Sequence, residues 1–118
     1  MDASAVLAWA FGEPAADSVE AQLGDAVVTS PNWAEVLQKV NDTGRDAKTI
    51  AVAMLGFGIN VVQVDIDDAT ATADLWERGR PLSLADRFCI AVGRRLDVPI
   101  WTCDRAWSGV DERVVVIR

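Results

Sequence analysis

The chain has 118 residues, of which 51% are hydrophobic, with 18 acidic and 11 basic side chains and a net charge of −7. A chain of this length buries roughly two thirds of its unfolded surface, so a single domain over residues 1–118 is expected. It has no histidine, which excludes Ser-His-Asp and Cys-His nucleophilic sites and His-ligated zinc, and leaves carboxylates with Mg²⁺ or Mn²⁺ for any hydrolytic chemistry.

Short apolar strands alternate with helices in the first half of the chain. The pattern predicts a strand fragment at Met1 and Asp2, helices over residues 4–11 and 14–23, a strand over 26–30, helices over 32–40 and 45–55, and a strand over 60–64. Glycines or prolines follow several of these helices, as is typical of helix ends.

The second half continues the same alternation. It predicts helices over residues 67–79 and 83–96 and strands over 99–103 and 113–117. The strands are short, nearly continuous apolar runs, as expected for a parallel sheet that is covered on both faces. We therefore expect a three-layer α/β/α fold with a mostly parallel sheet of about five strands.

Four acidic residues fall where the carboxyl ends of these strands should meet. Asp2 ends the first strand fragment, Glu35 lies one helical turn after the strand 26–30, and Asp104 directly follows the strand 99–103. Asp86 begins the helix that leads into that last strand. Ligands of open parallel sheets bind beyond the carboxyl ends of the strands, so all four side chains could converge on one crevice.

Each acid also has a purely structural interpretation. Asp86 follows Ser83 by three residues, the spacing of a capping box, and Asp104 could cap a short helix. Glu35 lies nearly opposite the apolar stripe of its helix, which favours a solvated position. Convergence argues against these interpretations, because two unpaired carboxylates about 4 Å apart repel by roughly 4 kcal/mol at an effective dielectric near 20. A divalent cation among them reverses that term.

Positive charge is concentrated near the C-terminus. Residues 1–74 carry 3 basic and 12 acidic residues, whereas residues 75–118 carry 8 arginines and 6 acidic residues. A solvated helix face is one interpretation of these arginines, and a local rim for phosphates is the other. Arg87 and Arg105 are the candidate phosphate contacts.

Several stretches together resemble a known family. "MDASAVLAWAFGEP", "SPNWAEVLQKV", "LSLADRFCIAVGRRLDVPIWTCDRAW" and "VVVIR" are similar, in this order and spacing, to the motifs of PIN-domain ribonucleases of the VapC type, the toxins of bacterial toxin-antitoxin modules. The resemblance implies a cluster around Mg²⁺ or Mn²⁺, with Asp2 and Asp104 as direct ligands and Asp86 and Glu35 positioning metal-bound water. Ser4 and Thr102 match polar positions that support the cluster.

The resemblance also implies an activity and partners. Members cut RNA endonucleolytically, form homodimers and are silenced by a small antitoxin whose tail lies in an apolar groove. Trp9, Phe11 and Trp33 could line such a groove, although core packing explains them equally well. Family members carry several apolar residues before the first acid, whereas only Met1 precedes Asp2 here. Either the chain begins late or the first strand is very short, with its amino group near the metal site.

Cellular location follows from two further observations. No basic segment followed by an apolar one opens the chain, and no apolar run is long enough to cross a bilayer. Cys89 and Cys103 fall in apolar contexts and are expected to be reduced core thiols. We therefore expect a cytoplasmic protein.

Three other functions are compatible with parts of the sequence. Asp65 and Asp67 match part of a haloacid-dehalogenase-like phosphatase motif, but Ala69 does not fit it. Asp65 could also be the phosphoacceptor of a receiver domain, although the lysine that such a domain needs is missing after the last strands. Helix capping explains Asp65 or Asp67 better. The third alternative is a PIN-like domain that binds RNA or a partner without cutting.

Overall fold

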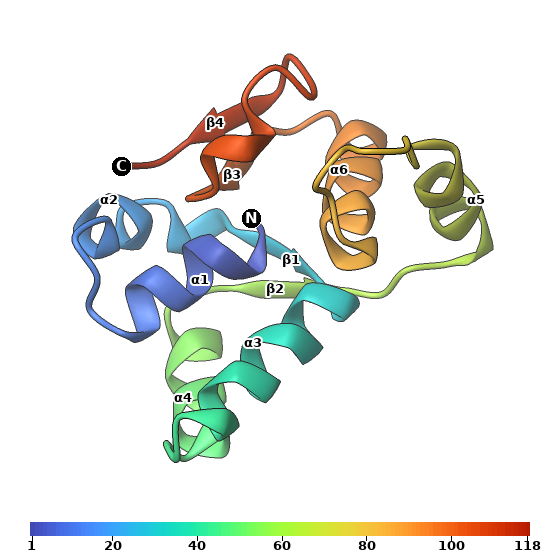
Figure 1. Cartoon of the computed structure of the whole chain (residues 1–118). Coiled ribbons are helices and arrows are strands. Elements are labelled where there is room, and N and C mark those ends of the chain that lie inside the picture. The colour runs from blue at the N-terminus through green and yellow to red at the C-terminus, as the bar shows by residue number, and fades with distance from the viewer.

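The structure, a computed structural model, describes all residues 1–118 as a mixed α/β fold with parallel strands (Figure 1). Its elements, in chain order, are α1 (Ala3–Ala10), α2 (Ala16–Glu20), the 3₁₀ helix η1 (Leu23–Asp25), β1 (Val27–Thr29), α3 (Ser30–Asp42), α4 (Ala47–Gly56), β2 (Asn60–Val62), α5 (Ile66–Asp74), α6 (Leu84–Leu96), β3 (Ile100–Thr102), the 3₁₀ helix η2 (Arg105–Trp107) and β4 (Val114–Val116). No helix is long and apolar enough to cross a membrane.

The strands form two parallel pairs rather than one sheet of about five. β1 pairs with β2, and β3 pairs with β4. The strand fragment expected at Met1 and Asp2 is not a strand, because two residues are too few to form a ladder. They still join the two pairs: the Met1 amino group donates a hydrogen bond to the Val27 carbonyl (2.9 Å), and the Asp2 amide donates one to the Trp101 carbonyl (2.9 Å).

Local capping interactions set where the helices begin. α3 begins at Ser30 rather than at residue 32, because Thr29 is its N-cap and accepts a hydrogen bond from the Asn32 amide (3.3 Å). α6 begins as predicted, with Ser83 and Asp86 forming a reciprocal capping box. α5 has a second such box between Asp65 and Asp68.

Two helices are shorter than the sequence pattern indicates. The helix predicted over residues 14–23 is α2 followed by η1, so that its second half is a 3₁₀ turn. The helix predicted over residues 67–79 ends at Asp74. Beyond it the Arg80 amide donates to the Glu77 carbonyl (3.2 Å) in a turn that contains Gly79 at φ +82°, a conformation that a helix cannot continue through.

The core has two parts. The larger contains buried side chains of α1, α3, β1 and the segments around them, including Val6, Val28 and Val36. The smaller lies between α6 and the β3–β4 pair and includes Ile90, Ile100 and Trp107. Figure 1 shows α3 and α4 below the β1–β2 pair, α1 and α2 to the left of it with α1 also packed against α3, and α5 and α6 packed together to the right.

Gly93 allows α6 to approach β3. A Cβ atom built at this position would lie 2.7 Å from Ile100 Cδ1 and would also overlap Cγ1 of the same buried side chain. We expect Gly93→Ala to lower the free energy of unfolding by about 1–3 kcal/mol, the usual cost of overpacking. Urea denaturation measures this, with Gly56→Ala as the control because a Cβ there meets nothing within 4 Å. Equal stability of the two variants would contradict the close packing.

Candidate active site

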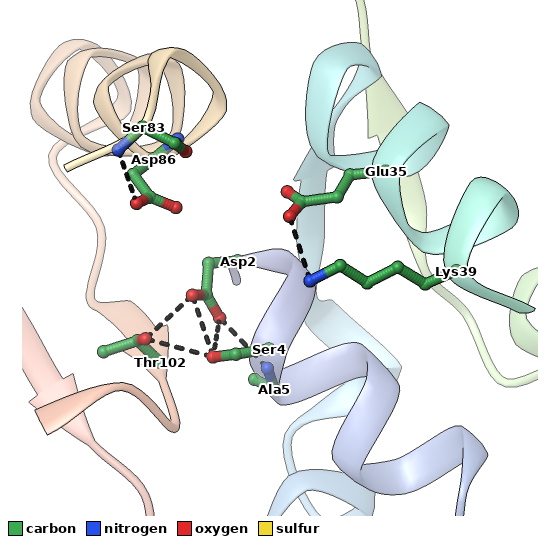
Figure 2. Close-up of polar contacts among 8 residues, drawn as sticks. All are labelled: Asp2, Ser4, Ala5, Glu35, Lys39, Ser83, Asp86 and Thr102. Carbon is green, nitrogen blue, oxygen red and sulfur yellow. Dashed lines mark hydrogen bonds and ion pairs between the residues drawn. The ribbon is translucent and has the colours of Figure 1, made fainter. Parts of the chain in front are cut away.

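Asp2 is a buried carboxylate held by several donors. It is the N-cap of α1, and its side chain accepts hydrogen bonds from the Ala5 amide (3.0 Å), the Ser4 hydroxyl (2.9 Å) and the Thr102 hydroxyl (2.8 Å) (Figure 2). Its exposed fraction is only 2%. Burial raises the pKa of Asp2, while these hydrogen bonds oppose the increase.

The same hydroxyl groups connect α1 to the end of β3. The oxygens of Ser4 and Thr102 lie 3.2 Å apart. The Ser4 oxygen also accepts from the Cys103 amide (3.0 Å), and the Thr102 oxygen accepts from the Asp104 amide (3.0 Å). The segment that carries Asp104 is therefore fixed relative to Asp2. Asp104 itself is exposed and caps η2, accepting from the Ala106 amide (2.9 Å).

Asp86 faces this region from the first turn of α6. Its carboxylate accepts a hydrogen bond from the Ser83 amide (2.8 Å), as the capping-box interpretation predicted. Burial raises the pKa of Asp86, the hydrogen bonds with Ser83 oppose the increase, and the negative charges of Glu35 and Asp104 add to it. Asp86 is therefore close enough to both Glu35 and Asp104 to be repelled by each of them.

Glu35 approaches from α3 and is paired with a lysine on its own helix. Glu35 Oε1 lies 3.3 Å from Lys39 Nζ, and the other carboxylate oxygen, Oε2, is buried without a hydrogen-bond partner. Figure 2 shows Glu35, Asp86 and Asp2 directed toward a common region, with the Lys39 ammonium group between Glu35 and Asp2. The solvated position expected for Glu35 is only partly observed, since its side chain is 30% exposed.

Comparison with known protein families assigns the chain to one of them. The family model described as the PIN domain matches residues 1–113. The chain belongs to the PIN-domain family. PIN domains are typically Mg²⁺-dependent nucleases. No curated protein sequence matches the chain significantly.

The carboxylates of this PIN domain fit a hard divalent cation in their chemistry, although they do not enclose one. All four predicted acids offer oxygen atoms, the donors that Mg²⁺ and Mn²⁺ prefer, and Glu35 Oε2 has no other partner. No three acidic or cysteine side chains lie close enough together to form a finished metal site. Lys39 supplies the positive charge nearest to Glu35, and the acids would have to draw together around a bound ion.

The two arginines predicted to contact phosphates differ in their surroundings. Arg87 Nη1 donates to the Thr72 carbonyl of α5 (3.2 Å), which holds this side chain between the two helices, and its Nε is buried without a partner. Arg105 is exposed on η2, beside Asp104. Arg105 therefore has the side chain that is freer to reach a ligand.

Most other arginines of the expected rim form ion pairs within the PIN domain. Arg95 binds both carboxylate oxygens of the buried Asp68 (2.7 and 3.1 Å), and Arg94 and Arg113 both bind Asp111. These pairs join α5 to α6 and α6 to the β3–β4 region. Most of the arginines in residues 75–118 therefore stabilise the fold.

The family match also decides between the alternative interpretations of Asp65. Asp65 N-caps α5, accepting from the Asp68 amide (2.9 Å). Capping was the preferred interpretation and is confirmed. The phosphatase and receiver interpretations were wrong, because the match to the PIN domain extends through this segment.

Lys39 was not predicted to be part of this region. Its signal was present, because a glutamate followed four residues later by a lysine forms an ion pair on one face of a helix. The sequence of α3 alone does not show which of its faces is covered, because two helices distant in sequence, α1 and α6, pack against it.

Proposed function

We propose that this PIN domain is an endoribonuclease that hydrolyses RNA phosphodiester bonds with Mg²⁺ or Mn²⁺ held by Asp2, Asp104, Asp86 and Glu35. The observation that supports this best is the position of Asp2. Its carboxylate is 2% exposed and is held by Ser4, Thr102 and the Ala5 amide, while the charges of Glu35 and Asp104 oppose the ionisation of Asp86, a cost that a bound cation would offset.

Each residue has a distinct part in this proposal. Ser4, Thr102 and the Ala5 amide fix the Asp2 carboxylate, so that it does not have to reorganise when a ligand binds. Asp104 is exposed and would face the bound RNA. Asp86 and Glu35 would orient water. A bound divalent cation would lower the pKa of water and neutralise phosphate charge.

Cleavage of RNA is therefore expected to require a divalent cation. Total cellular RNA incubated with the purified protein should be cut in Mg²⁺ or Mn²⁺, remain intact with excess EDTA, and be cut again when Mg²⁺ is restored. Mapping the new 5′ ends reports activity and target together. Equal cleavage in EDTA and in Mg²⁺ would rule out the metal-dependent reaction.

We further propose that the protein is a VapC-type toxin with a small antitoxin and a homodimeric assembly, on the strength of its similar motifs. Trp9, Phe11 and Trp33 are partly buried and packed against the main core, so core packing accounts for much of their surface. Phe57 adds an exposed aromatic side chain on the edge of Trp9. In this proposal the exposed parts of these rings meet the antitoxin.

The alternative is a PIN domain that binds RNA without cutting it. The observation that favours this alternative is the open arrangement of the acids, with a lysine already paired to one of them. The cleavage experiment separates the two functions, because a binding module leaves total RNA intact in every metal.

A further inference from the structure

A groove extends from the acidic region along one face of α1. Its volume is about 470 Å³. It is lined by residues of α1, of the segment after β3 and of α3, namely Ser4, Leu7, Phe11, Glu13, Lys39, Cys103 and Asp104. Ser4 and Asp104 belong to the candidate active site, so the groove begins where the proposed chemistry occurs.

The floor of the groove has a fixed length. Ser4, Leu7 and Phe11 are spaced as one stripe of an α-helix, and residues 4 to 11 span about 10 Å along its axis. Successive nucleotides of a stacked strand rise by roughly 3.4 Å along its axis, so at most about three stacked nucleotides fit along this floor.

Lys39 supplies positive charge at the active-site end of the groove. It is the one basic side chain in the groove lining. Its side chain is 54% exposed, and its contact to Glu35 is a single ion pair at 3.3 Å between residues on one helix. Such solvent-accessible pairs within one helix contribute little to stability, so the ammonium group can exchange one anion for another at little cost.

Phe11 lines the other end of the groove, and Arg45 lies over its ring. The Arg45 guanidinium lies 4.4 Å from the centroid of the Phe11 ring, and Arg45 is exposed. Bases of single-stranded RNA stack on aromatic rings and on guanidinium planes, and the guanidinium edges donate to phosphates. Lys39 and Arg45 are two of only three basic residues in the first 74 positions.

We infer that this groove binds the RNA strand beside the scissile phosphate, with Lys39 on a backbone phosphate and the Phe11–Arg45 pair stacked on a base. The inference rests on the proposed function, since it names how the substrate of that site is held. Glu13 lies at the same groove and opposes this binding through its negative charge.

Binding is tested separately from cleavage. In the Asp104→Asn background, with saturating Mg²⁺, fluorescence anisotropy is measured with labelled single-stranded oligoribonucleotides of mixed sequence over a range of salt concentrations. Lys39→Met is expected to weaken binding about tenfold and to lower the slope of log K against log salt by roughly 0.7. Lys39→Arg should restore both, because it keeps the charge.

Lys48→Met is the matched control. It removes the same charge from an exposed position on α4 that does not line the groove, so affinity should stay close to that of the background protein. Phe11→Leu keeps apolar bulk in the core but removes the ring. It should weaken binding at least about fivefold without changing the salt slope. Glu13→Gln should tighten binding.

The outcomes separate this inference from the proposed function. Cleavage by the native chain, combined with unchanged binding by Lys39→Met and Phe11→Leu, would overturn the groove and leave the nuclease standing. Weakened RNA binding by both variants supports the groove, whether or not the native chain cuts RNA. Absence of cleavage by the native chain would refute only the nuclease. Absence of RNA binding by the Asp104→Asn protein, or equal loss in Lys48→Met, would overturn the groove.

Discussion

Asp104→Asn is expected to reduce Mg²⁺-dependent RNA cleavage by about 100-fold or more while leaving the fold unchanged. Asparagine lacks the negative charge that a hard cation needs. It can still cap η2, because its side-chain oxygen can accept from the Ala106 amide as Asp104 does. Asp86→Asn should behave in the same way, since an amide oxygen can replace the acceptor of the Ser83 amide.

Cleavage assays and circular dichroism together check this expectation. Asp17→Asn is the control, because it removes one charge from an exposed position in α2 away from the acids. The toxin proposal adds a second readout: expression of the native chain in bacteria should stop growth, and expression of Asp104→Asn should not. Undiminished cleavage by both Asp104→Asn and Asp86→Asn would refute the assigned site.

Asp2→Asn is expected to abolish cleavage and yet to stabilise the metal-free protein at neutral pH by roughly 0.5–2 kcal/mol, as often occurs when a functional residue is replaced. The amide removes a buried negative charge. It has nearly the same shape, and its oxygen and nitrogen can bond to the Ala5 amide and to the hydroxyl groups of Ser4 and Thr102. Thermal unfolding in EDTA measures the gain.

The gain should depend on pH in a defined direction. Because the pKa of Asp2 is raised in the folded protein, its protonation stabilises the fold, and this contribution is complete below the pKa of the unfolded chain. This stabilisation is lost as the pH rises through the pKa of Asp2 in the folded protein. The greater stability of Asp2→Asn relative to the native chain should therefore appear over that pH range and persist at neutral pH. A variant less stable than the native chain at neutral pH would show that hydrogen bonding outweighs burial at this position.

Local signals in the sequence predicted much of the fold. Ser83 and Asp86 carry the spacing of a capping box, and α6 begins at Leu84, immediately after its N-cap Ser83. The apolar stripe of that helix, Cys89, Ile90 and Gly93, is buried as expected. These features depend on residues within one or two helical turns, which is why the sequence pattern is sufficient to find them.

Features that depend on distant parts of the chain were not predictable. The strands form two pairs because only Met1 and Asp2 lie between them, and these two residues bond to Val27 and Trp101, far away in sequence. The arginines gave no signal of their partners either, because Arg95 finds Asp68 only once α5 packs on α6. The acids were predicted from their positions near strand ends, whereas the ion pair of Glu35 was missed.

The hydrogen bond between Asp2 and Thr102 joins residues that are 100 positions apart. Closing a loop of this size costs conformational entropy before any contact repays it, so contacts of this kind tend to form late in folding. During synthesis, α1 leaves the ribosome long before β3 does. A nascent chain therefore holds Asp2 and Ser4 without Thr102 and Asp104, and the candidate site becomes complete only after β3 has been made.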